Sequence, residues 1–348
     1  MTHLPFAVEA TVLKLLLALP ERVQRTLLRR PIVVDGQTLS TEVQFLLALK
    51  RTARLPAAES LPLAQARVEL RRQQLLAGGR QHIGALRDLE VAGADGPLRA
   101  RLYTPTSRLG AEPAPTLMFF HGGGWMYGDL ESHDPPCRFL AEQSGVQILS
   151  VDYRLAPEHK FPAAVEDCRA AYRWLVSHLD EVNADVTRLA VGGDSAGGSL
   201  AASTAIWAAE QELPLAFQLL IYPGADFVER AESRKLFGEG FILTELFMNG
   251  AEDAYFAPGA DKSVPDASAV RRLDFPEKIA PAYVITGGFD PLRDEGEAYA
   301  RLLSKQGVDV ETKRYSSMVH GFIHFVGIGR EAKGYNQEIA QRLGRALA

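Results

Sequence analysis

Hydrophobic residues recur every three or four positions over the first 80 residues, a spacing typical of amphipathic helices. Three helices are expected there: around Val8, Val12, Leu16 and Leu19; around Val43, Leu46 and Leu47; and over 63–76. The second begins at Thr41 and Gln44, whose spacing matches a capping box. The third is followed by Gly78 and Gly79, and glycine commonly ends a helix. The N-terminal region is therefore predicted to be helical.

From about residue 86 the pattern changes, because short apolar runs typical of strands begin to alternate with longer helical patterns. The expected strands are 86–91, 98–103, 116–120, 146–151, 188–191, 217–221, 282–286 and 308–315, and the expected helices are 137–143, 163–179, 196–211, 293–306 and 331–346. This alternation predicts an α/β fold with a largely parallel sheet covered by helices on both faces. The first two runs have no helix between them and are expected to form an antiparallel edge.

The segment 224–275 interrupts this alternation. It mixes glycines, acidic residues and aromatic residues and contains no clear strand pattern. We expect it to be an insertion over the sheet. The chain is therefore predicted to consist of an N-terminal helical region, 1–80, and a larger domain, 81–348, that contains this insertion.

The charge balance narrows the class of partner. The formal net charge is −5, which argues against a nucleic-acid-binding protein and favours small neutral or apolar ligands. Residues 1–80 differ from the rest, with 12 Lys and Arg against 6 Asp and Glu. Either these bases coat the outer faces of helices packed on an acidic body, or a helix here contacts anionic lipid.

The two cysteines and the N-terminus bear on the compartment. Cys137 and Cys168 have neither metal-ligand nor redox spacing and are expected to be free thiols in a reducing compartment. The apolar run TVLKLLLALP is too short to span a bilayer and is interrupted by Lys14. We therefore predict a cytoplasmic protein without stable membrane insertion.

The stretch LAVGGDSAGG, 189–198, places a serine between a predicted strand and a predicted helix. Its G-x-S-x-G pattern is typical of a sharp turn that holds Ser195 in a strained conformation with the hydroxyl projecting. A serine hydroxyl needs a base, and the base needs an orienting carboxylate, so Ser195 as a nucleophile requires an acid and a histidine elsewhere. A phosphate-binding loop is disfavoured, since no lysine lies nearby.

Both partners follow in the order Ser, Asp, His. Asp290 follows the strand-like run 282–286, and His320 follows the run 308–315. This chain order, with 95 and 30 residues between successive members, is that of an α/β-hydrolase triad. Asp294 is an alternative acid, but it is expected inside the following helix, whereas His324 lies among apolar residues and is expected to be packed and hydrogen-bonded.

A second signal is FFHGGGWMYGD, which begins at Phe119. Consecutive glycines allow backbone N–H groups to converge on an oxyanion. We expect Gly123, Gly124 and the N–H of Ala196 to form an oxyanion hole, with His121 bracing the loop. Trp125 and Tyr127 either line the substrate pocket or pack beneath the loop.

Five ordered blocks carry a resemblance that spans about residues 86–348: HGGGW (121–125), DYRLAPEHKFPAA (152–164), GDSAGG (193–198), DPLRDE (290–295) and HGF (320–322). They resemble the hormone-sensitive-lipase-like esterases, also called bacterial family IV. The resemblance implies an α/β-hydrolase catalytic domain over 81–348 and a cap formed by residues 1–80 and the insertion 224–275. It also implies ester hydrolysis without a cofactor or metal. It maps the nucleophile to Ser195, the acid to Asp290 and the base to His320. Ser317 replaces a glycine usual before the histidine.

The sequence thus predicts a serine carboxylesterase that forms an acyl-enzyme on Ser195 and hydrolyses short- to medium-chain esters. Two alternatives stay open: an amidase or formamidase that uses the same triad, and a non-catalytic ligand receptor on the hydrolase fold. The resemblance also implies a homodimer through the strand near 308–315.

Overall fold

The computed structural model describes residues 5–28, 30–53, 57–110 and 113–348. Its centre is an eight-stranded sheet in the order β10-β9-β8-β7-β5-β6-β4-β3. The strands are β3 (Ala85–Gly93), β4 (Gly96–Thr104), β5 (Ala114–Phe120), β6 (Gln147–Val151), β7 (Ala184–Asp194), β8 (Phe217–Ile221), β9 (Ala282–Phe289) and β10 (Val310–Val319). Each corresponds to one predicted apolar run.

Neighbouring strands from β10 to β6 pair in parallel, whereas β4 pairs antiparallel with both β6 and β3. The predicted antiparallel edge is therefore confirmed. The central strands β5, β6 and β8 are buried along their whole length, as expected for parallel strands covered on both faces.

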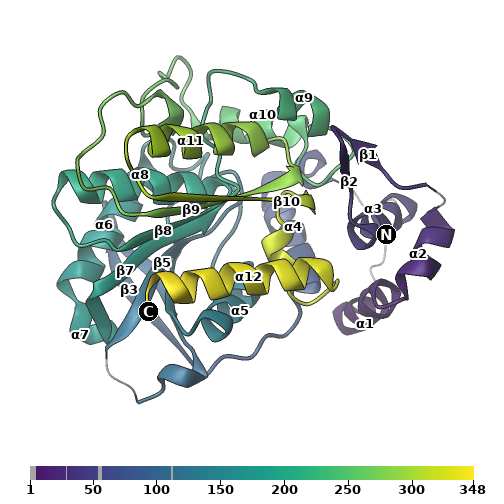
Figure 1. Ribbon diagram of the computed structural model, residues 1–348, viewed down its shortest axis with the longest axis horizontal. Coiled ribbons are helices and arrows are strands. Elements are labelled where there is room, and N and C mark those ends of the chain that lie inside the picture. The colour runs from purple at the N-terminus through teal and green to yellow at the C-terminus, as the bar shows by residue number, and fades with distance from the viewer. Residues whose placement is uncertain (1–4, 29, 54–56, 111–112) are drawn as a thin grey trace.

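Helices cover both faces of this sheet (Figure 1). They are α5 (Asp134–Ser144), α6 (Ala163–Ser177), α7 (Leu179–Val182), α8 (Ala196–Glu210), α11 (Arg293–Lys305) and α12 (Glu331–Ala346). Helices α5 and α12 pack together on one face, and α6 and α8 on the other. Each face has its own apolar core, with Leu140 and Leu343 in one and Leu175 and Leu200 in the other. The predicted α/β-hydrolase layering is confirmed.

The N-terminal region contains α1 (Phe6–Leu17), α2 (Glu21–Leu28), α3 (Thr41–Thr52) and α4 (Leu63–Gly78). The three predicted helices are present, and α4 ends at Gly79 as expected. Helix α2 was not predicted, nor was the short hairpin β1 (Val33–Val34) and β2 (Gln37–Thr38).

The predicted capping box at Thr41 and Gln44 is wrong. Ser40 occupies the N-cap position of α3 and makes no side-chain cap. The Thr41 hydroxyl instead donates to Glu21, and the Gln44 amide bonds to backbone groups of Arg30 and Ile32. Both side chains therefore connect α3 to the chain before it, which is a tertiary role that local spacing does not reveal.

The segment 224–275 joins β8 to β9 and contains α9 (Glu232–Phe237) and α10 (Glu245–Tyr255), and no strand among its residues, all of which are described. Four 3₁₀ helices complete the described elements: η1 (Ala58–Ser60), η2 (Thr106–Arg108), η3 (Ala269–Arg271) and η4 (Phe322–His324). In the described part of the chain, no helix combines the length and apolar character needed to cross a membrane.

Candidate active site

Ser195 lies at the sharp turn from β7 to α8 and has φ 56° and ψ −122°. A positive φ is strained for a residue with a Cβ, and such strain persists only where the surrounding structure enforces it. The Ser195 N–H donates to the carbonyl of Ile221 at 2.8 Å. At Gly197 a Cβ would lie 1.9 Å from the carbonyl oxygen of Phe120. The glycines of this motif therefore let β5 pass close to the turn that presents the serine.

The structure brings Ser195, His320 and Asp290 together in one hydrogen-bonded series. His320 Nε2 lies 2.9 Å from Ser195 Oγ, and His320 Nδ1 lies 2.8 Å from Asp290 Oδ2. Asp290 is fully buried, and its other carboxylate oxygen accepts a hydrogen bond from the N–H of Leu292 at 2.8 Å. Because β7, β9 and β10 are parallel, their carboxyl ends place these three residues at the same edge of the sheet.

Asp294, the alternative acid, lies within α11, and its hydrogen-bond partners are residues other than His320. Its carboxylate accepts hydrogen bonds from the N–H of Ser233 at 2.8 Å and from Arg293 at 2.7 Å. Asp294 therefore connects α11 to α9 of the insertion.

The loop after β5 approaches the same site. Gly123 and Gly124 have φ of 118° and 61°, and both line a cavity together with Ser195 and His320. At Gly123 a Cβ would lie 2.4 Å from the carbonyl oxygen of Tyr127, so only glycine fits this turn. Ala196 is the first residue of α8, where backbone N–H groups have no partner within the helix. The predicted donors thus come from two segments that adjoin Ser195.

His121 holds this loop from behind. Its ring stacks on Tyr153 with centroids 4.3 Å apart, and Tyr153 donates a hydrogen bond to the His121 carbonyl at 2.6 Å. Complete burial and the neighbouring His133 lower the pKa of His121 to about 4, so the ring is neutral near pH 7.

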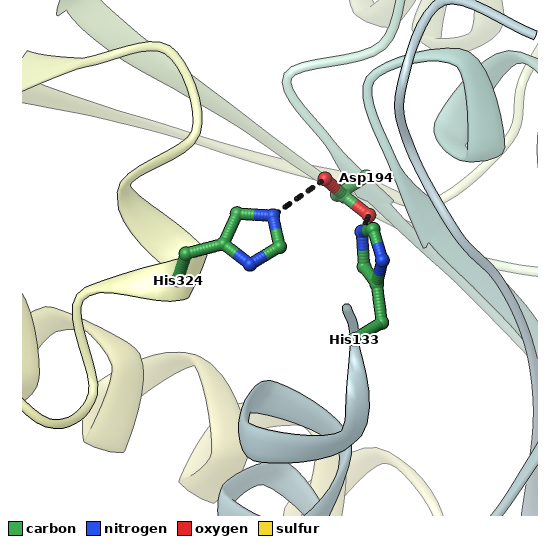
Figure 2. Close-up of side chains that lie close together, drawn as sticks. All are labelled: His133, Asp194 and His324. Carbon is green, nitrogen blue, oxygen red and sulfur yellow. Dashed lines mark ion pairs between the residues drawn. The ribbon is translucent and has the colours of Figure 1, made fainter. Parts of the chain in front are cut away.

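Asp194, the residue before the serine, holds the loop from a second direction. Its Oδ1 accepts a hydrogen bond from the N–H of Gly122 at 2.8 Å and lies 3.1 Å from His133 Nε2. Figure 2 shows Asp194 between His133 and His324, whose Nε2 lies 4.0 Å from the carboxylate. Burial alone would raise the pKa of Asp194, but His133, His324 and the Gly122 N–H together hold it well below its usual value. The oxyanion loop is therefore tied to a buried anion.

This arrangement around Asp194 was not predicted from the sequence. The available signal was the acidic residue inside GDSAGG, since an aspartate beside a buried serine needs hydrogen-bond donors. The donors, Gly122 and His133, lie 72 and 61 positions earlier in the chain, and no local pattern connects them to Asp194.

His133, Asp194 and His324 are also the group in the described chain that could hold a metal ion, since their ligand atoms all lie within 4.8 Å of one another. Each already has a hydrogen-bonding partner: Asp194 binds the Gly122 N–H, His133 lies beside Asp194, and His324 Nε2 lies 3.2 Å from the Gln74 amide. A hydrogen-bonded network accounts for the cluster. The absence of a metal and of a cofactor stays a prediction.

Trp125 and Tyr127 lie in packed surroundings and not in the wall of the cavity. Trp125 stacks on Tyr255 with centroids 4.6 Å apart, and Tyr127 stacks on Phe247 with centroids 5.2 Å apart. Of the two alternatives left open by the sequence, these positions correspond to packing beneath the loop.

The cavity in front of Ser195 has a volume of about 710 Å³. Much of its apolar wall comes from α1 (Val12, Leu13, Leu16), α3 (Leu46, Leu47, Leu49) and the insertion (Phe241, Ile242, Leu243, Phe247). The two segments predicted to form a cap therefore meet over the serine. The division of the chain at residue 80 stays a prediction.

Comparison with known proteins identifies the family. The family model described as alpha/beta hydrolase fold matches residues 117–324. Carboxylic ester hydrolase LipN of Mycobacterium tuberculosis is 37% identical over 325 residues, which cover 89% of this chain and 84% of that protein. Ethyl acetate hydrolase of Pseudomonas putida is 37% identical over 261 residues, covering 74% of this chain and 82% of that protein.

Comparison with solved structures gives the same family as comparison of the sequences. A hyperthermophilic esterase from Pyrobaculum calidifontis superposes with a TM-score of 0.83 at 37% identity, covering 89% of this chain and 99% of that one. An ester hydrolase from the metagenome of Lake Arreo, complexed with a derivative of bipyridine phosphonate, gives a TM-score of 0.84 at 36% identity, covering 88% and 98%. The chain belongs to the α/β-hydrolase-fold family. The predicted resemblance to hormone-sensitive-lipase-like carboxylesterases is thereby confirmed.

Proposed function

We propose that this α/β hydrolase is a serine carboxylesterase that acts through an acyl-enzyme on Ser195. The observation that carries the proposal is the hydrogen-bonded series from Asp290 through His320 to Ser195 Oγ, with distances of 2.8 and 2.9 Å, beside an apolar cavity. Names of the relatives, which include a carboxylic ester hydrolase and an ethyl acetate hydrolase, support the same class of reaction.

In the proposed reaction Ser195 Oγ attacks the ester carbonyl while His320 Nε2 accepts the hydroxyl proton. Asp290 accepts a hydrogen bond from His320 Nδ1–H, which fixes the tautomer that leaves Nε2 free and stabilises the cation that then forms. His320 donates the proton to the leaving alcohol. A water molecule, deprotonated by His320, then hydrolyses the acyl-enzyme.

The tetrahedral intermediates carry a negative charge on the former carbonyl oxygen. We assign the backbone N–H groups of Gly123, Gly124 and Ala196 to stabilise that charge. The positive φ of both glycines and the position of Ala196 at the N-terminus of α8 support this assignment.

The proposed substrates are esters of short- to medium-chain acids. The volume of about 710 Å³ and the leucine-rich wall of the cavity support an apolar acyl or alcohol group of this size. No step of this mechanism requires a cofactor. A cytoplasmic location, supported by two buried free cysteines, and a homodimer through the edge strand β10 belong to the same proposal.

A series of nitrophenyl esters from acetate to decanoate tests the proposal against its alternatives. We expect turnover that falls beyond medium chain lengths and that disappears in Ser195→Ala. Faster cleavage of the matched nitroanilides or of formamides would favour the amidase. Turnover no greater than that of the Ser195→Ala control would favour the ligand receptor.

A further inference from the structure

Helices α1 and α2 lie together at one end of the molecule (Figure 1). Both helices expose apolar side chains. Six of the fifteen large apolar side chains exposed in the described chain belong to these two helices: Phe6 (46% exposed), Val8 (46%), Val12 (43%), Leu15 (66%), Val23 (42%) and Leu27 (61%). Such concentration in two short helices marks an interaction surface, because scattered exposed apolar residues are ordinary but gathered ones are not.

The exposed positions form stripes. In α1, Val8, Val12 and Leu15 follow the i, i+4, i+7 spacing of one helix face, and in α2 Val23 and Leu27 follow i, i+4. The inward face of α1 is apolar as well, since Leu17 is buried and Leu13 and Leu16 pack against the core. A helix that is apolar on both sides is normally covered on both sides. One side of α1 therefore needs a partner.

The charges beside this surface indicate what the partner is. The acidic residues of the two helices are engaged: Glu9 pairs with Arg72, and Glu21 accepts a hydrogen bond from Thr41. The exposed bases Lys14, Arg22 and Arg30, by contrast, form no ion pair with any residue of the described ranges.

A surface that is apolar and basic matches anionic lipid, in which phosphate groups lie above the acyl chains. A second copy of this chain fits less well, because a symmetric contact would bring these unpaired bases against themselves.

The surface is also continuous with the cavity. Val12 is both exposed and part of the cavity wall, and Leu13 and Leu16 of the same helix line that wall further in. An apolar molecule held at α1 would therefore meet an apolar path toward Ser195.

We propose that α1 and α2 form a docking surface for anionic lipid, which Val8, Val12, Leu15, Val23 and Leu27 enter and which Lys14, Arg22 and Arg30 hold by charge. If the chain is the proposed esterase, its substrates are esters dissolved in, or adsorbed on, a lipid surface. These esters reach Ser195 along α1. The lipid contact itself does not depend on catalysis.

Co-sedimentation of the full chain, as Ser195→Ala, with vesicles tests the contact without ester turnover. We expect binding to vesicles of phosphatidylcholine mixed with phosphatidylglycerol, weak binding to phosphatidylcholine alone, and binding that weakens as salt is raised. The double variant Leu15→Glu/Leu27→Glu should bind at least about tenfold more weakly, because two charges would have to enter the interface. Both positions are exposed, so thermal unfolding should match the parent.

Leu273→Glu is the matched control, since Leu273 is 87% exposed but lies outside α1 and α2. This variant should bind like the parent. A second variant, Lys14→Gln/Arg22→Gln, should lower binding to the anionic vesicles and reduce its salt dependence.

Three results would overturn the proposal: no vesicle binding by the parent, equal binding by Leu15→Glu/Leu27→Glu, or a dimer in solution that this variant dissociates, which would assign the surface to a second copy. The esterase proposal fails separately, by the absence of nitrophenyl acetate turnover in the native chain. The docking variant should hydrolyse that dissolved ester normally.

Discussion

The serine turn and the N-terminal helices lie on either side of one cavity but are stabilised in different ways. Around Ser195 every constraint acts on the backbone: a glycine that no other residue can replace at 197, a positive φ at 195 and a buried carboxylate at 194 that binds Gly122. Around α1, by contrast, apolar side chains remain exposed. The reacting atoms are thus fixed by backbone geometry at the sheet edge, whereas part of the surface on the other side of the cavity consists of exposed apolar side chains.

If the catalytic side of the cavity is the more constrained one, the largest effect on kcat should come from a change in Asp290, the carboxylate that orients His320. Asp290→Asn should lower kcat by about 10⁴-fold, because an amide favours the wrong imidazole tautomer. Asp294→Asn is the matched control, since Asp294 is four residues away and bonds to α9 instead. It should retain a rate close to that of the native enzyme. Steady-state hydrolysis of nitrophenyl butyrate measures both, and the opposite ranking would move the acid to Asp294.

A smaller loss is expected where the serine turn meets the oxyanion loop. Asp194→Asn replaces the charged acceptor of the Gly122 N–H by a neutral one, so the loop should lose part of its order and kcat should fall by about 10²-fold with little change in KM. Affinity for a boronic acid, which mimics the tetrahedral intermediate, should fall in parallel. Asp185→Asn, at the opposite end of β7, is the control. An unchanged kcat in Asp194→Asn would show that the oxyanion loop keeps its conformation without the charge on Asp194.

The buried histidine His324, which lines the cavity near Ser195, should make the stability of the fold depend on pH. Burial lowers the pKa of His324 from 6.5 to about 3, so the folded protein keeps this ring neutral while the unfolded chain protonates it. The resulting stability is complete above pH 6.5 and is lost as the pH falls toward 3.

Between pH 7 and pH 5, His324→Gln should therefore lose about 2 kcal/mol less of its free energy of unfolding than the native protein. Urea unfolding at the two pH values measures this difference. The exposed His159→Gln serves as control and should show the native pH dependence. Parallel pH profiles for His324→Gln and the native protein would contradict the shift.

On the other side of the cavity, a change should alter selectivity but leave the chemistry intact. Ala53, which follows α3 and lines the cavity, is exposed, so Ala53→Trp can narrow the cavity without crowding the core. We expect kcat/KM for nitrophenyl octanoate to fall about tenfold while that for acetate changes little. Ala18→Trp is matched, since Ala18 likewise follows a helix and is exposed but does not line the cavity. Equal losses on both esters would mean that this wall does not select chain length.

The same contrast explains what could be predicted from the sequence. All eight strands of the sheet, and the three residues that it brings together at Ser195, follow from local patterns, since each of these residues lies within five positions after its own apolar run. Helix α2 was not predicted from local patterns. Nor were the roles of Thr41 and Gln44, because these two side chains bond to Glu21 and Arg30, which lie 20 and 14 positions earlier in the chain. Asp194 and His133 were missed for the same reason.

The part of the cavity wall that precedes the sheet is one continuous segment of the chain. Much of the cavity wall comes from residues 9–77, which precede every strand of the eight-stranded sheet. Exchange of this one continuous segment between two related hydrolases would therefore transfer the substrate preference of one enzyme to the other. Recombination of two such genes near codon 80 would produce enzymes with a new substrate range and the same catalytic residues.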